Sequence, residues 1–292
     1  MPELPEVEST VRGLSPLIVG RKIVSVWSDA PKLIRSGTFA DFKDNIRGRK
    51  VVSISRRAKN ILIGLDGGYT LLIHLKMTGH LMVGRWSFLK DKGREIAKTD
   101  SSGAMSDKVN NYVHVIFVLD DGNMLALSDL RKFAKVSLGK TEELFYKEKL
   151  DQIGPEATDI PLLDFEKALK SSKRSIKQVL LDQEKIAGIG NIYSDDILWK
   201  ARIHPLRPSI SLTSTEIKAI YKAMREILNI AIKLRGTSIS DYRDVRGEKG
   251  GYGPKRLVYR RDGEPCKRCG TPITKLKVGG RTARFCPSCQ II

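Results

Sequence analysis

Short apolar runs of strand length, separated by Gly and Asp, dominate the chain between Ile23 and Leu138. Turn signals such as Asp66-Gly67-Gly68 and Asp120-Asp121-Gly122 join successive runs into hairpins. The pattern predicts strands at Ile23–Trp27, Val51–Ser55, Ile61–Leu65, Tyr69–Leu75, Val113–Leu119, Met124–Ser128 and Phe133–Leu138. We therefore expect this part of the chain to form an antiparallel β-sandwich.

Helical spacing of apolar residues occurs on both sides of these strands. Val7, Val11 and Leu14 share one face of a helix that precedes the strands. After about Leu144 the spacing becomes helical again, and the last helix begins at a capping box formed by Thr213 and Glu216. The predicted helices of this second region are 162–170, 173–182, 192–201 and 215–234.

Two polar stretches interrupt the pattern. The stretch from Trp86 to Asn110 has no period and predicts an inserted loop. The stretch from Gly236 to Pro254 is rich in Gly, Arg and Asp and predicts a flexible loop. We expect an α+β multidomain protein with an N-terminal domain at 1–140, a helical domain with the second loop at 141–258, and a cysteine module at 259–292.

Charge points to the class of partner. The 292 residues include 52 Lys and Arg against 33 Asp and Glu, which gives a net charge of +19. Such a surface favours a polyanion, and nucleic acid above all, because binding releases counterions. No apolar run approaches the roughly 18 to 20 residues of a membrane span, so we expect a cytoplasmic, nucleoid-associated protein without a membrane partner.

The four cysteines, all in the last 27 residues, predict a metal site. Cys266 and Cys269 form one C-x2-C pair and Cys286 and Cys289 another, with 16 residues between the pairs. Two such knuckles supply four thiolates for one tetrahedral, structural Zn²⁺. From Arg243 to Ile292 the sequence has 13 Lys and Arg against 4 Asp and Glu, so we expect this module to contact phosphates.

The N-terminus offers a candidate nucleophile. If Met1 is removed, the chain begins with Pro2, a secondary amine whose pKa lies roughly near 8, as for other α-amino groups. A secondary amine that attacks a sugar aldehyde forms a cationic iminium, which can drive elimination, and Glu3 beside it can transfer the protons.

Four motifs together resemble the formamidopyrimidine-DNA glycosylase family: Pro2 to Glu8, Arg56-Arg57-Ala58-Lys59, Gly188 to Tyr193 and the cysteine module. The resemblance runs from Pro2 to Gln290. It implies a β-sandwich, a helix-two-turn-helix domain and a C-terminal β-hairpin zinc finger. It also implies a base-excision-repair enzyme that acts as a monomer on damaged double-stranded DNA, removing oxidised purines through a Pro2 Schiff base and cutting the strand by β,δ-elimination.

The resemblance also implies roles for individual residues. Pro2, Glu3, Lys59 and Arg281 match the catalytic residues of the family, with Lys59 and Arg281 also contacting phosphate. Asn191, Lys177 and Lys173 match residues that grip the phosphates beside the lesion, with the two lysines expected on the helix before Asn191. Met77, Arg131 and Phe133 match side chains that fill the gap left by an extruded base, and they should be exposed if they have this role.

The chain departs from the family at the DNA-binding surface. Leu130 stands where proline is usual, Lys132 where a second arginine is usual, and Tyr112 where a histidine usually contacts DNA. The Trp86–Asn110 stretch is longer than the family pattern. The loop from Thr237 to Pro254 corresponds to the segment that covers the flipped base.

Two other functions fit parts of the sequence. A non-catalytic zinc-finger DNA-binding protein would explain the charge, the helices and the cysteines, but not the N-terminus. An endonuclease VIII-like glycosylase for oxidised pyrimidines would share the scaffold, although that branch usually has glycine at the position of Leu4.

Overall fold

The computed structural model describes residues 1–91, 94–238 and 241–292, so two positions of each expected loop, 92–93 and 239–240, lie outside the described residues. The chain divides into two compact units. We call Met1–Asp151 with Leu234–Gly253 the sandwich unit, and Gln152–Lys233 with Pro254–Ile292 the helical unit. The segment after the last long helix thus returns to the sandwich unit. The expected boundaries at 140 and 258 remain predictions.

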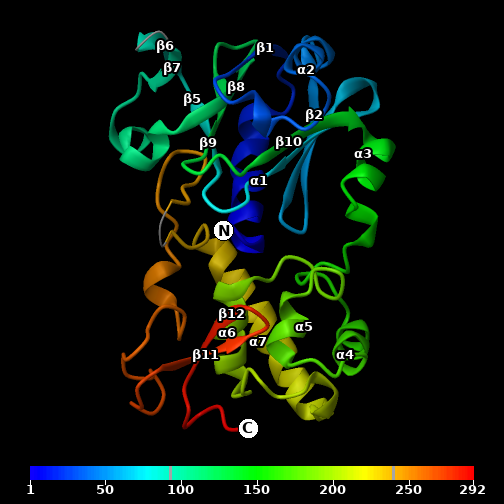
Figure 1. Cartoon of the computed structure of the whole chain (residues 1–292), viewed down its shortest axis with the longest axis vertical. Coiled ribbons are helices and arrows are strands. Elements are labelled where there is room, and N and C mark those ends of the chain that lie inside the picture. The colour runs from blue at the N-terminus through cyan, green and yellow to red at the C-terminus, as the bar shows by residue number, and fades with distance from the viewer. Residues whose placement is uncertain (92–93, 239–240) are drawn as a thin grey trace. The chain divides into compact units, whose positions relative to one another are not determined.

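Two four-stranded sheets build the sandwich unit, and every strand pair in them is antiparallel (Figure 1). One sheet has the order β1 (Ile23–Ser28), β8 (Val113–Leu119), β9 (Met124–Ser128) and β5 (His80–Gly84). The other has the order β10 (Lys135–Lys140), β4 (Tyr69–His74), β3 (Asn60–Leu65) and β2 (Val51–Arg57). The predicted sandwich is confirmed, and β5 is an additional strand.

The first helix, α1 (Leu4–Ile18), contacts strands of both sheets. Its predicted face, with Val7, Val11 and Leu14, is buried in the main core of the unit. Burying apolar surface against both sheets fixes the helix, and with it the start of the chain, in the sandwich unit. Two shorter helices were not predicted: α2 (Phe39–Ile46) and α3 (Thr141–Lys147).

The prediction of an irregular loop at Trp86–Asn110 is wrong for most of its length. β6 (Trp86–Asp91) and β7 (Arg94–Thr99) form a hairpin, and short 3₁₀ turns follow it. Phe88 of the hairpin packs on Trp27 of β1 with 5.3 Å between ring centroids. After Trp86 the residues of β6 are all exposed and mix apolar with charged side chains, so no alternation marks this strand in the sequence.

The helical unit contains four helices and the C-terminal hairpin among its described residues. These are α4 (Leu162–Lys170), α5 (Ile176–Leu181), α6 (Asn191–Ala201), α7 (Ser214–Lys233), β11 (Thr274–Val278) and β12 (Arg281–Phe285). The helix expected from Lys173 starts later, because Ser175 and Gln178 form a capping box that sets its first turn. No helix among the described residues combines the length and apolar character that a bilayer crossing requires.

Two histidines in the sandwich unit make its stability depend on pH. Burial lowers the pKa of His74 to about 3 and that of His80 to about 4, from an ordinary value of 6.5. The folded state favours the neutral rings. Their contribution to the free energy of unfolding is therefore present above pH 6.5 and is lost as the pH falls toward 4.

We therefore expect the free energy of unfolding to fall by about 1.4 kcal/mol per pH unit for each histidine in this window. Urea unfolding at pH 7, 6 and 5 measures the slope. His80→Gln should reduce it by one histidine's share, and an unchanged slope in that variant would contradict the assignment.

Candidate active site

The N-terminal turn is buried and tightly bonded. Pro2 is buried, and the side chains of Glu3 and Glu6 are 3% and 1% exposed. Glu3 is the N-cap of α1 and forms a capping box with Glu6, whose Oε2 accepts from the Glu3 N–H at 2.7 Å. The other oxygen, Oε1, accepts from the Thr237 N–H at 2.7 Å. Glu6 therefore supports the position of residues 2 and 3.

Gly236 allows the chain after α7 to reach Glu6. Its φ is +77°, and a Cβ there would lie 2.7 Å from Glu6 Oε1. Any other residue would be strained by the backbone conformation and would push the carboxylate away.

Lys59 lies in the turn that joins β2 to β3, which begins at Asn60. Ala58 takes the left-handed conformation, with φ of 52°, to make this turn. Lys59 is 7% exposed. The preceding Arg56 pairs with Glu8 of α1 at 2.9 Å, which holds the turn beside the first helix.

These charges act on the start of the chain. Burial lowers the pKa of the Met1 amino group, the carboxylates of Glu3 and Glu6 raise it, and Lys59 lowers it again. The carboxylates of Glu3, Glu6 and Asp241 thus act on this amino group against the ammonium of Lys59. Such a site can hold an amine in its neutral, nucleophilic form and offers groups that can give and take protons.

A buried carboxylate organises the loop that carries Arg131 and Phe133. Asp129 is fully buried and accepts from the N–H groups of Phe133 and Ala134 at 2.7 Å each, and from the hydroxyl of Thr78. Thr78 follows Met77, so the Asp129 side chain fixes both the loop of Met77 and the loop of Arg131 and Phe133. Sequence reasoning missed Asp129, although an aspartate before a turn is a signal of such bonding.

The expected gap-filling side chains are exposed on these loops. Met77 is 41% and Phe133 is 48% exposed, and the Arg131 guanidinium lies over the Phe133 ring, 4.5 Å from its centroid. This is the exposure that insertion into a duplex would require. Tyr112 is half-buried just before β8, and its carbonyl accepts from the Asp129 N–H at 2.8 Å.

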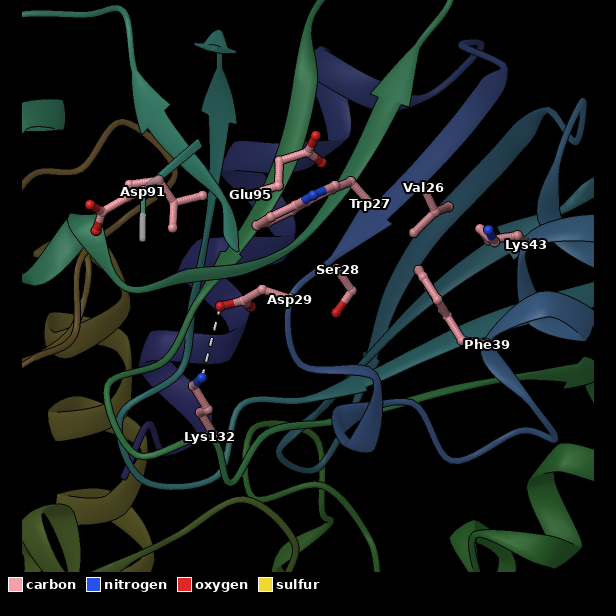
Figure 2. Close-up of a pocket in the computed structure, with 10 residues that line it drawn as sticks. Val26, Trp27, Ser28, Asp29, Phe39, Lys43, Asp91, Glu95 and Lys132 are labelled. Atoms are coloured by element: carbon pink, nitrogen blue, oxygen red, sulfur yellow. Dashed lines mark ion pairs between the residues drawn. The ribbon is translucent and has the colours of Figure 1, made fainter. Parts of the chain in front are cut away.

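A cavity of about 920 Å³ lies in the sandwich unit, between β1, α2 and the β6–β7 hairpin (Figure 2). None of its described lining residues is a predicted site residue. It reaches the same loop through Lys132, whose Nζ lies 3.8 Å from Asp29 Oδ2. Asp29 also bonds His114 at 2.8 Å. The predicted chemistry therefore lies outside this cavity.

In the helical unit, Asn191 begins α6 directly after Gly190, the N-cap. Gly188 has φ of 96°, a conformation that favours glycine. The Asn191 amide donates to the Thr282 carbonyl at 3.1 Å. The N-terminus of a helix favours an anion, and the phosphate contact of this motif remains a prediction.

The two lysines predicted to grip phosphate differ in environment. Lys173 is exposed in the loop before α5, and not on a helix as expected. Lys177 is fully buried in α5, where its Nζ donates to Ser194 Oγ at 3.1 Å and Asp195 Oδ1 at 2.5 Å. Burial raises the pKa of Asp195 to about 7, and Lys177 opposes the shift. For both lysines the phosphate contact remains a prediction.

The four cysteines meet in one place. The sulfur atoms of Cys266, Cys269, Cys286 and Cys289 all lie within 4.8 Å of one another. Four thiolates at this separation fit the tetrahedral shell of Zn²⁺, and four protein ligands leave no position open for a reactant. The site is therefore a structural zinc site, as predicted.

Helix α6 anchors this zinc module through two acidic residues that sequence reasoning missed. Asp196 Oδ1 accepts from the N–H of Val258 at 2.9 Å, and Asp195 Oδ2 from the N–H of Arg284 at 3.1 Å. The Trp199 indole donates to Cys266 Sγ at 3.3 Å. Arg281 is exposed at the start of β12, where a phosphate could reach it.

Three models of known protein families match this chain, one for each of its three parts. Family models described as the formamidopyrimidine-DNA glycosylase N-terminal domain, the H2TH domain of the same enzyme, and a zinc finger found in FPG and IleRS match residues 1–136, 153–243 and 263–291. A formamidopyrimidine-DNA glycosylase of Pelotomaculum thermopropionicum is 40% identical, with 99% of each chain covered.

Solved structures show the same likeness. A Lactococcus lactis FPG mutant in complex with Fapy-dG containing DNA is 34% identical, with a TM-score of 0.85 and 100% of both chains covered. A complex of the Lactococcus lactis protein with abasic-site DNA gives the same identity and TM-score, over 99% of this chain and 100% of that one.

Proposed function

Because this chain belongs to the formamidopyrimidine-DNA glycosylase family, we propose that it removes oxidised purines from damaged double-stranded DNA and then cleaves the strand at the same site. The observation that carries the proposal is the buried Pro2-Glu3 terminus, held by Glu6 and faced by Lys59. It acts as a monomer, and its substrate places it on the nucleoid in the cytoplasm. Relatives bound to Fapy-dG and to abasic-site DNA support both steps.

The first step is attack by the Pro2 nitrogen, once Met1 has been removed. The lone pair of the amine forms a bond to C1′ of the flipped nucleotide, and the bond from C1′ to the damaged base breaks with its electrons leaving on the base. The nitrogen then loses its proton, which neutralises the departing base, so that its lone pair is free to break the bond from C1′ to the ring oxygen. Glu3 gives a proton to the sugar ring oxygen as the ring opens, which leaves a cationic iminium between Pro2 and C1′. Glu3, Glu6 and Lys59 act electrostatically on the amino group of Met1, one residue before Pro2, and we expect them to act on this cation as well.

The second step is elimination. Loss of the C2′ proton to a base sends electrons toward the iminium and expels the 3′ phosphate, and a second elimination expels the 5′ phosphate. Lys59 and Arg281 would stabilise the phosphates as they leave, since cations lower the cost of developing negative charge. The product is a one-nucleotide gap.

The remaining predicted residues hold the duplex. Met77, Arg131 and Phe133 would fill the space of the extruded base, because they are exposed and Asp129 fixes the loop of the last two. Four further residues would contact the backbone of the DNA: Asn191, Lys173, Lys177 and Tyr112. Zn²⁺ holds the two cysteine knuckles together and so positions Arg281, without taking part in a bond change.

Borohydride trapping tests the proposal. The protein is mixed with a labelled duplex that contains 8-oxoguanine opposite cytosine, and reduction should give a covalent adduct that maps to residue 2. Matched duplexes with thymine glycol, an abasic site and no lesion serve as controls. Adduct formation on thymine glycol alone would favour the endonuclease VIII-like function. Tight binding without an adduct on any duplex would favour a non-catalytic binding protein.

A further inference from the structure

The Trp86–Asn110 insertion touches the chain that supports the N-terminal site. Asp107, near its end, receives two hydrogen bonds from the Arg243 guanidinium, from Nε at 3.1 Å and from Nη2 at 2.8 Å. Arg243 is 4% exposed, and its side chain pairs with Asp107, which is 32% exposed. Arg243 in turn holds the pKa of Asp107 below its ordinary value. Both donors bind the same oxygen, Asp107 Oδ2, and charge-assisted hydrogen bonds of this kind with one buried partner are strong.

A second contact binds the same two segments. The Asn110 side chain is 2% exposed and donates to the Ala104 carbonyl at 2.8 Å and to the Gly247 carbonyl at 3.3 Å. Gly247 has φ of +78°, and a Cβ there would lie 2.7 Å from Asn110 Nδ2. The backbone of Gly247 therefore approaches the insertion more closely than any side chain would permit.

The segment from Tyr242 to Gly247 carries this contact to the first helix. Val245 packs in the main core, and its carbonyl accepts from the Val83 N–H at 3.0 Å. The buried Tyr242 hydroxyl donates to the Glu6 carbonyl at 3.0 Å. The Arg243 guanidinium also donates to the Tyr242 carbonyl at 2.9 Å. Arg243 therefore links Asp107 of the insertion to Tyr242, which contacts Glu6.

We propose that the insertion supports the active site, and that Asp107 and Asn110 are positioning residues for Glu6. Through Arg243 and Gly247 they hold the Tyr242–Gly247 segment against α1. That segment and Thr237 fix Glu6, which fixes Glu3 and hence Pro2. The proposal rests on the proposed function for its kinetic consequence, but its structural part can be tested without activity.

Asp107→Asn is the informative change. Asparagine keeps the cap that Asp107 makes to the Val109 N–H, but it removes the charge that balances buried Arg243. Asp100→Asn is the matched control, because Asp100 is exposed in the same insertion and accepts from Ser87 within it. Under enzyme excess, we expect the single-turnover rate constant for 8-oxoguanine excision to fall about tenfold in Asp107→Asn and to stay within about twofold in Asp100→Asn.

A role in stability alone would behave differently. It would reduce the fraction of active enzyme, measured as the burst amplitude in a separate experiment with substrate in excess, and leave the single-turnover rate constant unchanged. Arg243→Gln should give a similar loss, and the double variant should be no slower than the slower single one, because both remove the same pair. Equal rate constants for Asp107→Asn and Asp100→Asn would overturn the proposal.

Amide hydrogen exchange separates this proposal from the proposed function. Glu3 and Thr237 each donate a backbone N–H to Glu6, and both should exchange at least about tenfold faster in Asp107→Asn than in Asp100→Asn. Unchanged exchange rates of these two amides would overturn the proposal, whatever the rate of excision. If the wild-type protein forms no adduct on any duplex, the proposed function fails, and the exchange result still decides whether the insertion positions Glu6.

Discussion

Pro2→Ala is expected to lower the rate of base excision by at least about 10³-fold, equivalent to about 4 kcal/mol of transition-state stabilisation. Pro2 is the proposed nucleophile, and its nitrogen must lie where the bonds of Glu3 and Glu6 place it. Alanine supplies a primary amine that rotates freely about the N–Cα bond, because it lacks the ring that ties the nitrogen to the side chain. Single-turnover excision and borohydride trapping measure the loss.

Two controls make this result interpretable. Pro5→Ala changes the next proline of the same buried turn without changing the first residue, and it should keep the adduct. The intact mass of each protein must show that Met1 is absent, because an acylated Pro2 nitrogen is an amide and cannot attack. Wild-type excision by Pro2→Ala in a sample free of Met1 would refute the proposed mechanism.

Removal of zinc is expected to unfold the C-terminal module and to weaken DNA binding by more than about 100-fold. A structural site of this type contributes about 10 kcal/mol or more of binding free energy, all of it available to folding. The module carries Arg281 and much of the positive charge of the last 50 residues. Its loss should also reduce the dependence of DNA affinity on salt, because fewer counterions are released.

A chelator titration can follow this unfolding from inside the helical unit. Trp199 donates to Cys266 and packs beside Cys286, so its fluorescence should change as zinc leaves. Cys286→Ser should behave like the chelated protein. Ser288→Ala lies in the same knuckle, where its hydroxyl pairs only with that of Thr271 among the described bonds, and it should bind DNA normally. Normal binding by Cys286→Ser would argue against a structural role for the metal.

Features that depend on local sequence could be predicted. The spacing of the cysteines, the apolar face of α1 and the strands β2, β3, β4, β8 and β9 all arise from patterns within a few residues. These patterns were sufficient for the fold class and the zinc site. They also located Pro2 and Glu3, since both belong to one motif.

Features that depend on distant partners could not be predicted. The β6–β7 hairpin packs on Trp27, nearly sixty positions earlier, and its own strands lack a regular alternation. The burial of Lys177 depends on its partner Asp195. Asp195 lies on α6, the helix that follows the glycine turn. Asp129 satisfies backbone groups that become donors only once the loop has formed. In each case a polar or exposed residue has a role that periodicity does not encode.

The carboxylate of Asp129 has a consequence for how the protein searches a genome. Because its bonds hold Phe133 and Ala134 in place in the protein alone, the loop needs no ordering when a duplex arrives. If Phe133 inserts into the duplex as proposed, the loop can meet one base pair after another at the same small entropic cost. The time spent at each position would then be set by how easily that pair opens, so damaged pairs, which open more readily, would hold the protein longer than intact ones.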